Sequence, residues 1–204
     1  MPVSEITPDV QVRRAGAADE ATVARVVAAA FHDDPVGRWL VPDEERRRRL
    51  FPEFFRGHAR AFIAHEETHL DAAGTGAALW LPEGRELFAD AAAERELGAE
   101  VARILGADAE RAFRLDEILH AHVPAEPHLL LQILAVVPEA QGRGIGSALI
   151  RTVLERADRE GVPAYLEATS ERNRALYERH GFVFRGAIPV PDGPTLHAMW
   201  REPR

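Results

Sequence analysis

The 204-residue sequence contains no cysteine, and all 25 of its basic residues are arginine. The absence of cysteine excludes disulfide bonds, thiolate zinc sites, iron–sulfur clusters and a cysteine nucleophile. The absence of lysine excludes a Schiff-base residue and the lysine of a Walker phosphate loop. No apolar run reaches the roughly 18 residues that cross a bilayer, and Met1–Glu5 lacks the basic flank and apolar core of a secretory signal. We therefore expect a cytoplasmic protein with no membrane partner.

Acidic residues outnumber basic ones in the first part of the chain only. Residues 1–127 hold 15 arginines against 24 acidic residues, a net charge of −9, whereas residues 128–204 hold 10 against 9. Phosphate neutralisation supplies most nucleic-acid affinity, so a chain with no basic stripe predicts no nucleic-acid partner. The asymmetry favours a cationic ligand on the first part and an anionic one on the second. Drift in surface charge explains it equally well.

Strand-like and helical patterns alternate throughout and predict one α/β (α+β) domain over residues 1–204. Residues 84–122, rich in Ala, Glu and Leu, predict two or more additional helices, and residues 128–137 predict a fully buried strand. The remaining strands are expected over 10–13, 68–71, 76–81, 163–169, 182–185 and 195–200. The remaining helices are expected over 19–31, from 42 to 62, from the glycine-rich turn to about 160, and over 171–180.

Two patterns indicate functions that their context disfavours. The run Arg46–Arg49 follows three acidic residues and is better interpreted as a solvated helical face than as a nucleic-acid contact. His65-Glu66-Glu67-Thr68-His69 fits a zinc-protease pattern, which needs both histidines one turn apart on one helix. Strand-like sequence from Thr68 places His69 outside such a helix, and no third ligand follows at a close spacing. We expect no metal, and a metallohydrolase ranks third among the functions considered.

The strongest chemical signal is an apolar strand, Leu129–Val137, followed by a glycine-rich turn and an apolar-periodic helix. This arrangement exposes backbone N–H groups at a helix start, which favours phosphate or pyrophosphate. Gly142 and Gly144 would let the backbone approach the ligand, and Gly146 would allow close helix packing. The Walker and dinucleotide patterns both fail here. The predicted anion site is Gln141, Gly142, Arg143, Gly144, Ile145, Gly146 and Ser147.

These residues resemble the Gln/Arg-x-x-Gly-x-Gly/Ala motif of the GCN5-related N-acetyltransferases, read here as Gln141, Gly144 and Gly146. Residues 166–173 and 177–182 agree in order and separation, and the resemblance is specific over 128–185. Within the family the chain is most similar to puromycin N-acetyltransferase-like small-molecule acetyltransferases, on residues 161–167 and 190–194, with His197 where that group carries tryptophan. The resemblance implies a mixed, mostly antiparallel central sheet with a splay between two parallel strands, flanked by helices.

The resemblance further implies direct attack of an acceptor amine on acetyl-CoA in a ternary complex, with residues 1–127 on the acceptor side and 128–204 on the acetyl-CoA and catalytic side. Asn173 would bind the cosubstrate or brace the loop. Tyr177 would contact the cosubstrate and protonate the leaving thiolate, a phenol near pKa 10 suiting that task; a core aromatic is the alternative. A bulged or splayed strand would direct an N–H group at the thioester oxygen, from Ala135, Val136 or Val137.

The acceptor amine must lose a proton, and Glu167 is the main candidate to take it, directly or through water. Glu167 is expected on the strand face shared with Tyr165 and Thr169. A catalytic base and a structural carboxylate fit Glu167 equally well. The weaker candidates are His120, His122 and the pair Asp33-Asp34. The acceptor is expected to be a small basic molecule in a cleft opened by the first two helices and covered by the helices of 84–122. The expected apolar wall is Phe31, Trp39, Phe55 and Trp80, although at least half of these aromatics should pack in the core. The residues predicted to bind it are Asp34, Trp39, Trp80 and His122.

Other functions stay open at this stage. A fold alone does not establish chemistry, so a non-catalytic CoA-sensing or partner-binding domain is the main alternative. A peptide or protein N-acetyltransferase follows it. The sequence is compatible with a monomer or a homodimer.

Overall fold

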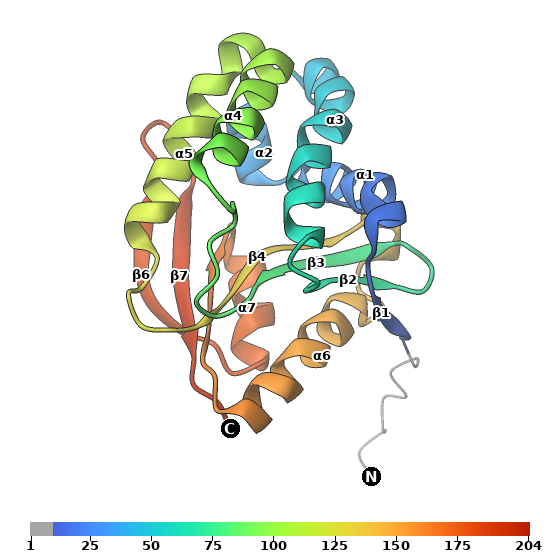
Figure 1. Ribbon diagram of the computed structural model, residues 1–204, viewed down its shortest axis with the longest axis vertical. Helices are drawn as coiled ribbons and strands as arrows, with labels where there is room; N and C mark the ends of the chain where they lie inside the picture. The colour runs from blue at the N-terminus through green and yellow to red at the C-terminus, as the bar shows by residue number, and fades with distance from the viewer. Residues whose placement is uncertain (1–9) are drawn as a thin grey trace.

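A seven-stranded sheet in the order β1-β2-β3-β4-β5-β7-β6 organises residues 10–204, the part of the chain that the computed structural model describes (Figure 1). Neighbouring strands are antiparallel except for β4 and β5, which are parallel. The segment Met1–Glu5, on which the expectation about a secretory signal rests, lies outside the described residues. The strands are β1 (Val12–Arg14), β2 (Thr68–Asp71), β3 (Gly76–Leu81), β4 (Leu129–Val136), β5 (Ala164–Ala168), β6 (Val183–Pro189) and β7 (Thr195–Arg201).

Helices cover both faces of this sheet. On one face, α1 (Glu20–Phe31) and α3 (Glu44–Ile63) pack on β3, and α1 also packs on β4; α6 (Ile145–Glu160) crosses β2, β3 and β4 on the other (Figure 1). The short α7 (Glu171–Arg179) lies against β5. The predicted additional helices are α4 (Ala91–Leu105), which packs on α3, and α5 (Ala109–His122), which packs on α4. The predicted mixed sheet with flanking and additional helices is confirmed.

The two parallel strands separate after a short paired region. Leu129, Leu130 and Leu131 of β4 pair with β5, but β4 then continues to Val136 without this partner. The resulting gap is the predicted splay. The associated bulge lies earlier than residues 135–137: Leu131 faces Trp80 and Ile133 faces Leu79, so Gln132 is the extra residue. Because a bulge increases local twist, its place at the end of the β4–β5 pairing accounts for the divergence of the strands.

Burial of β4 also differs from the prediction. Its side chains alternate between buried and half-buried positions, although the whole stretch 128–137 is apolar enough to predict complete burial. Leu134 and Val136, on the half-buried side, face the start of α6 around Gly146. Both residues lie beyond Leu131, the last residue of β4 that pairs with β5.

A helix that the sequence reading missed follows α1. The turn at His32–Pro35 ends α1 as predicted, but Pro35 then begins α2 (Pro35–Leu40). Proline is favourable at the first helical position because its missing N–H has no partner there in any helix. Asp34 caps this helix, since its Oδ1 accepts from the Val36 N–H at 2.9 Å.

The arginine run of α3 is only partly a solvated face. Arg47 is 4% exposed and donates to the carbonyl oxygens of His32, Val41 and Pro42. The interpretation as a solvated face is therefore wrong for Arg47, because buried carbonyl groups in the connection between α1 and α3 require donors. Arg46 pairs with Asp108 at 2.9 Å and Arg48 with Glu44 at 2.6 Å.

The two histidines of the zinc-protease pattern do not share a helix. His65 follows the end of α3, whereas His69 lies buried in β2, where burial and the nearby Arg14 lower its pKa to about 4. Within residues 10–204 no group of three or more histidine, aspartate or glutamate side chains is placed to hold a metal ion. No helix in the same range is long and apolar enough to span a membrane.

Candidate active site

The glycine-rich turn delivers β4 into α6 through two left-handed residues. Gly142 and Gly144 have φ angles of 76° and 81°, which strongly favour glycine. Gly144 is the N-cap of α6 and no side chain caps the helix. The first-turn N–H groups of Ile145, Gly146 and Ser147 consequently have no partner within the helix. Together with the positive end of a 16-residue helix, they form an anion-binding geometry.

Side chains of the predicted anion site brace the turn rather than project from it. Gln141 Nε2 donates to the Val136 carbonyl at 3.1 Å, and Arg172 of α7 donates to Gln141 Oε1 at 3.3 Å. Ser147 Oγ and His180 Nε2 are hydrogen-bonded at 3.0 Å. Burial and neighbouring arginines lower the pKa of His180, so its ring is neutral at pH 7. The side chain of Arg143, by contrast, is exposed.

Gly146 is not the glycine that close packing of α6 requires. A Cβ at this position would meet Leu134, Leu176 and Val136 at 3.7–3.8 Å, which is ordinary contact. At Gly76 of β3, in contrast, a Cβ would lie 2.5 Å from Ile145 Cγ2. The expectation that Gly146 allows close packing of α6 was therefore wrong. The glycine that α6 approaches closely is Gly76, in the strand beneath the helix.

Backbone direction separates the three residues at the end of β4 that were predicted to face the thioester, Ala135, Val136 and the following Val137. The Val137 N–H donates to the Thr75 carbonyl at 2.9 Å, on the β3 side of the strand. Because alternate residues of a strand point their N–H groups to opposite sides, the Ala135 N–H also points to β3. The N–H groups of Val136 and Leu134 point into the splay.

Glu167 stands on β5 at the other edge of the splay. Its Oε1 is buried and has no hydrogen-bond partner among the described residues. Burial raises the pKa of Glu167 to about 7, with an opposing contribution from the nearby Tyr165 hydroxyl. Burial and the Glu167 charge raise the pKa of Tyr165 in turn, and its hydroxyl donates to the His122 carbonyl at 3.3 Å. A carboxyl group with this pKa exchanges protons readily near neutral pH.

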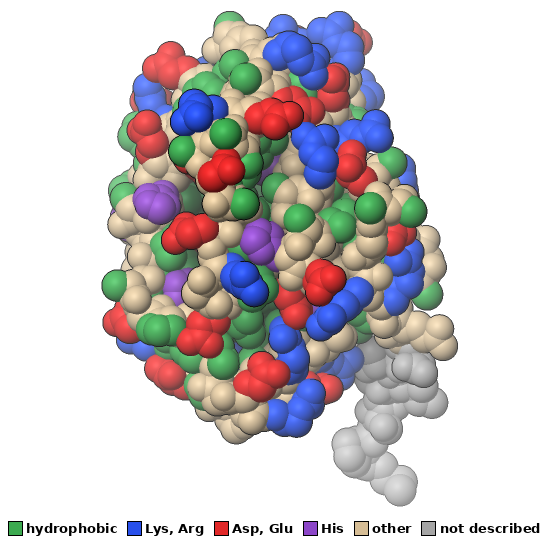
Figure 2. All heavy atoms as spheres, viewed as in Figure 1, with side chains coloured by type: hydrophobic (Ala, Val, Ile, Leu, Met, Phe, Trp, Pro, Cys, Tyr) green, Lys and Arg blue, Asp and Glu red, His purple; other side chains and the backbone are tan. Residues whose placement is uncertain are grey.

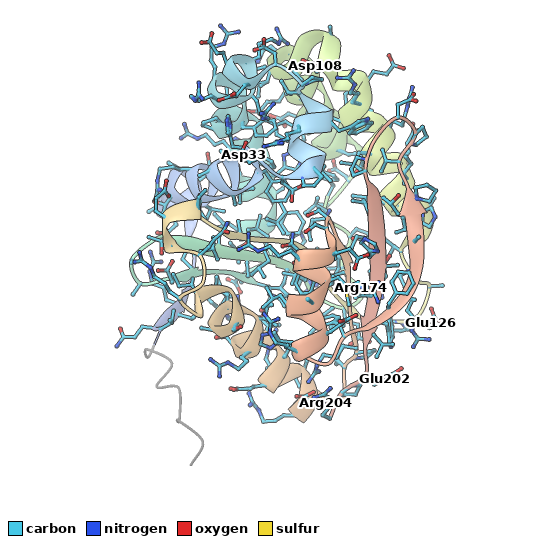
Figure 3. The ribbon with its side chains drawn as sticks, turned by 180° about the vertical axis from the view of Figure 1, so that it is seen from behind. Asp33, Asp108, Glu126, Arg174, Glu202 and Arg204 are labelled. Atoms are coloured by element: carbon cyan, nitrogen blue, oxygen red, sulfur yellow. The ribbon has the colours of Figure 1, made fainter. Side chains whose placement is uncertain are left out.

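A hydrogen-bonded chain joins the start of α2 to α7. Thr169 Oγ1 donates to Asp34 Oδ2 at 2.6 Å and accepts from Asn173 Nδ2 at 3.0 Å. Asp34 is also close enough to Tyr177 that, after burial, its charge contributes to raising the pKa of that phenol. Burial raises the pKa of Asp34 itself. The neighbouring Asp33 instead pairs with Arg38 at 3.1 Å on the exposed corner between α1 and α2 (Figure 3).

A cavity of about 550 Å³ lies between α3, α4, α5 and the sheet, within the usual range for small-molecule sites. Glu167 and Thr169 line it, so it reaches the edge of the splay. Acidic and basic side chains are interspersed on the face seen in Figure 2, with apolar surface between them. Six phenylalanines line the cavity: Phe31, Phe54, Phe55, Phe62, Phe88 and Phe113.

Comparison with known proteins agrees with this geometry. Residues 27–182 match the acetyltransferase (GNAT) family. The chain belongs to that family. It is an acyltransferase, and GNAT enzymes take their acetyl group from acetyl-CoA.

Three proteins similar to this GNAT acetyltransferase match it over different shares of its length. An uncharacterized N-acetyltransferase of Schizosaccharomyces pombe is 26% identical over 94% of this chain and 83% of that protein. A mycothiol acetyltransferase of Acidimicrobium ferrooxidans is 32% identical, but over 40% of this chain and 26% of that protein. A Corynebacterium glutamicum structure described as histone acetyltransferase HPA2 and related acetyltransferase superposes with a TM-score of 0.67 at 28% identity, covering 96% and 97% of the two chains.

A further solved structure shares the fold of this acetyltransferase. Arylalkylamine N-acetyltransferase 2 of Aedes aegypti superposes with a TM-score of 0.67 at 15% identity, covering 97% of this chain and all of that chain. At this identity the likeness concerns the fold alone.

None of the four predicted acceptor-binding residues of this GNAT chain lies in the cavity wall. Asp34 faces Thr169 instead, and Trp39 packs near Gly193 in the connection between β6 and β7. Trp80 is fully buried in the core. His122 is exposed at the end of α5, with its Nδ1 bonded to the Ile118 carbonyl at 2.7 Å. Phe31 and Phe55 do line the cavity.

Five polar residues of the cavity wall were not predicted from the sequence: His58, Glu94, Arg95, Asp116 and Gln132. Two of them had a recognisable signal. Gln132 interrupts the otherwise apolar stretch 129–137, and His58 shares the helical face of Phe54, Phe55 and Phe62. Asp116 lies among other charged residues of α5, so nothing local sets it apart.

Proposed function

We propose that this chain transfers the acetyl group of acetyl-CoA to the amine of a small molecule, by direct attack in a ternary complex. One observation carries the proposal: Glu167 lines the cavity and also stands at the splay edge opposite β4, the strand that leads into the anion-binding turn. A carboxyl group that can take a proton, a cavity large enough for a small amine, and a helix start suited to phosphate therefore all border the splay.

The residues at the splay fit the donor. When bound, acetyl-CoA supplies an activated acetyl group on a thioester. The N–H groups of Ile145, Gly146 and Ser147 would hold its pyrophosphate, and the Val136 N–H is directed to the side where the thioester oxygen would lie. Asn173 braces Thr169 and is available to the pantetheine arm.

Two side chains handle protons in this proposal. Glu167 takes the proton that the acceptor ammonium must lose, directly or through water. Tyr177 in α7 supplies a proton to the leaving thiolate. The raised pKa of Tyr177 keeps its hydroxyl protonated throughout the neutral range. Asp34 and Thr169 connect α2 with β5 beside both groups.

The placement of the cavity supports a small acceptor rather than a protein segment. Helices α4 and α5 supply much of its wall, and the net charge of −9 on residues 1–127 attracts a cation. The segments that resemble puromycin acetyltransferases lie mainly elsewhere: residues 190–194 connect β6 and β7, and the His197 ring packs near Phe184 and Glu171. Puromycin as the acceptor thus draws no support from the cavity.

Incubation with acetyl-CoA and a panel of amines in metal-free buffer tests this proposal. We expect CoA release with small basic amines, a preference for them over peptides, and a kcat/KM that falls as ionic strength rises, because the attraction is long-range. Tight CoA binding without turnover on any amine would favour the non-catalytic alternative. A clear preference for peptides would contradict a small acceptor.

Two glycines of α6 provide a matched test of the anion site. Gly144 and Gly161 lie at opposite ends of the helix, both left-handed, with φ angles of 81° and 71°. Replacing either with valine strains the backbone similarly, but only Gly144→Val places a side chain at the proposed phosphate site. We expect Gly144→Val to weaken CoA binding at least tenfold, about 1.4 kcal/mol, while Gly161→Val leaves it unchanged. Calorimetry on folded proteins measures both; equal affinities would refute the site.

A further inference from the structure

Two neighbouring strands place polar groups at the sheet end of the cavity. Gln132 of β4 and Glu167 of β5 both line it. Each directly follows a member of the last β4–β5 pair, Leu131 and Leu166, so the two side chains stand at the same level where the strands begin to diverge. The Glu167 Oε1 is buried without a hydrogen-bond partner among the described residues. This end of the cavity therefore offers an unsatisfied buried acceptor to a donor group.

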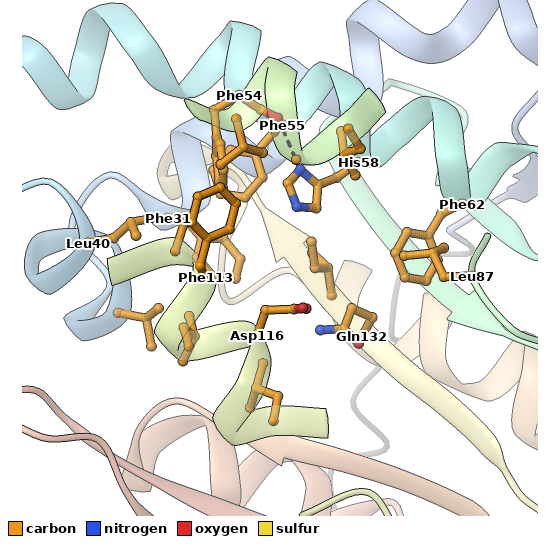
Figure 4. A pocket seen from close by; sticks show the side chains of 18 of the residues that line it. Phe31, Leu40, Phe54, Phe55, His58, Phe62, Leu87, Phe113, Asp116 and Gln132 are labelled. Atoms are coloured by element: carbon orange, nitrogen blue, oxygen red, sulfur yellow. Dashed lines mark hydrogen bonds between the residues drawn. The ribbon is translucent and has the colours of Figure 1, made fainter. Parts of the chain in front are cut away.

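Aromatic rings dominate the rest of the wall. Four phenylalanines gather beside Leu40 in Figure 4: Phe31, Phe54, Phe55 and Phe113. The Phe55 ring contacts those of Phe31 and Phe54, with centroids 5.4 Å and 4.8 Å apart. His58, also in the wall, has its Nδ1 bonded to the Phe54 carbonyl at 3.1 Å, and burial lowers its pKa, so this ring is neutral at pH 7. This part of the wall adds no charge that an occupant must match.

The remaining polar residues of the wall are exposed or already bonded. Glu94 and Arg95 of α4 and Asp116 of α5 are exposed, so water solvates their charges. The Thr169 hydroxyl donates to Asp34 Oδ2 at 2.6 Å. None of these residues requires a polar group from an occupant. A single donor at Glu167 therefore suffices, and the rest of the occupant can be hydrocarbon.

Phe113 of α5 differs from the phenylalanines of α3 in its exposure. It is 41% exposed, whereas Phe54, Phe55 and Phe62 are 7%, 6% and 1% exposed. Its ring lies beside Gly98 of α4, where a Cβ would be 4.0 Å from the Phe113 Cε1. Both residues line the cavity. An apolar group bound there would cover part of the Phe113 ring, and removing apolar surface from water is favourable.

We propose that the acceptor is an amine with a single ammonium group and a large apolar body, the amine lying at Glu167 and Gln132 and the body lying against Phe113 and Gly98. This inference rests on the proposed function for the position of the reacting amine. A second ammonium group would lose water among the phenylalanines. The carboxylates left to pair with it, Glu94 and Asp116, are exposed, and exposed ion pairs contribute little.

Four amines test the substrate class by binding and by turnover. Hexylamine and cadaverine have chains of equal length, but cadaverine carries an ammonium group in place of the terminal methyl. Ethylamine lacks the apolar body, and phenylpropylamine carries a larger one. Calorimetry with CoA present, which has no acetyl group to transfer, measures affinity, and CoA release from acetyl-CoA measures kcat/KM. We expect hexylamine and phenylpropylamine to exceed cadaverine and ethylamine at least tenfold in both quantities.

Phe113→Ala tests the assignment of the apolar body. We expect the affinities of hexylamine and phenylpropylamine to fall at least fivefold and that of ethylamine to stay unchanged, because ethylamine does not reach this ring. Phe184→Ala is the matched control: Phe184 is 38% exposed and lies on β6, outside the cavity wall. It should leave all four amines unaffected.

Gly98→Leu narrows the cavity without weakening its helix. Leucine is favoured over glycine inside a helix, so α4 should form at least as well. We expect kcat/KM for phenylpropylamine to fall at least tenfold, with ethylamine unchanged. Ala99→Leu, at the exposed neighbouring position outside the cavity wall, should change neither.

The outcomes separate this proposal from the proposed function. Cadaverine equal to or better than hexylamine, no binding of the apolar amines at millimolar concentration, or identical behaviour of the Phe113 and Phe184 variants would overturn the substrate class. A preference for hexanoyl-CoA over acetyl-CoA with ethylamine would also overturn it, because the cavity would then hold the acyl group. The expected order of binding without acetyl transfer would instead overturn the catalytic proposal and leave the binding class intact.

Discussion

Replacing Tyr177 with phenylalanine should lower kcat about 100-fold or more, with CoA affinity nearly unchanged, if this phenol protonates the leaving thiolate. The substitution retains the ring, which packs edge-on against Phe182 at 6.0 Å between centroids. Only the hydroxyl is lost, so the free energy of unfolding should change little. Single-turnover kinetics is the appropriate measurement, because slow product release would hide the effect in kcat.

The raised pKa of Tyr177 also predicts how kcat depends on pH. The sequence suggested an ordinary phenol, but burial and the charge of Asp34 raise its pKa above the usual value of 10. The hydroxyl therefore stays protonated up to at least pH 10, and no alkaline loss of kcat from its ionisation should appear below that pH. An unchanged single-turnover rate in Tyr177→Phe would assign the residue to packing.

Replacing Glu167 with glutamine should lower kcat at pH 8 by about 100-fold or more and abolish its dependence on pH near 7. The wild-type rate should rise as the pH increases through about 7, because the protonated carboxyl group cannot accept the amine proton. In Glu167→Gln that limb should be absent, since glutamine does not titrate. The kcat profile from pH 6 to 9 measures both expectations.

Stability distinguishes a base from a structural carboxylate at the same position. Burial raises the pKa of Glu167 from 4.5 to about 7, so the folded state favours its protonated form. By linkage, the wild type loses stability as the pH rises from 4.5 toward 7. Glu167→Gln should therefore be at least as stable as the wild type above pH 7, as urea unfolding would measure. Lower stability with an unaltered pH–rate profile would identify a structural carboxylate.

The features that were predicted from the sequence depend on residues that lie close together along the chain. The anion-binding turn depends on left-handed glycines and a helix start within a few residues, so Gly142, Gly144 and α6 were visible in sequence. The hairpin of β2 and β3 and the two helices between residues 84 and 122 follow from periodicity and turn residues that neighbour one another. Family membership was evident for the same reason, because its motif is contiguous.

The cavity was not visible in the sequence because its wall is assembled largely from α3, α4, α5, β4 and β5, which are distant in sequence. Apolar patterns mark Trp80 and Phe55 alike as buried, but only the packing of layers places Phe55 at a cavity and Trp80 in the core. Electrostatic state is likewise a tertiary property. A carboxyl group titrates near pH 7 at Glu167 because surrounding elements exclude water.

The sequence by itself thus determined the fold family, the glycine-rich turn that we propose binds the cosubstrate, and the candidate roles of Tyr177 and Glu167, since each depends on short-range pattern. Only the tertiary structure decided that Gln132 is the bulge residue, that Thr169 donates a hydrogen bond to Asp34, and that His58 lines the cavity. These features depend on register and on which surfaces meet, and pairing and packing fix both only when the chain is folded.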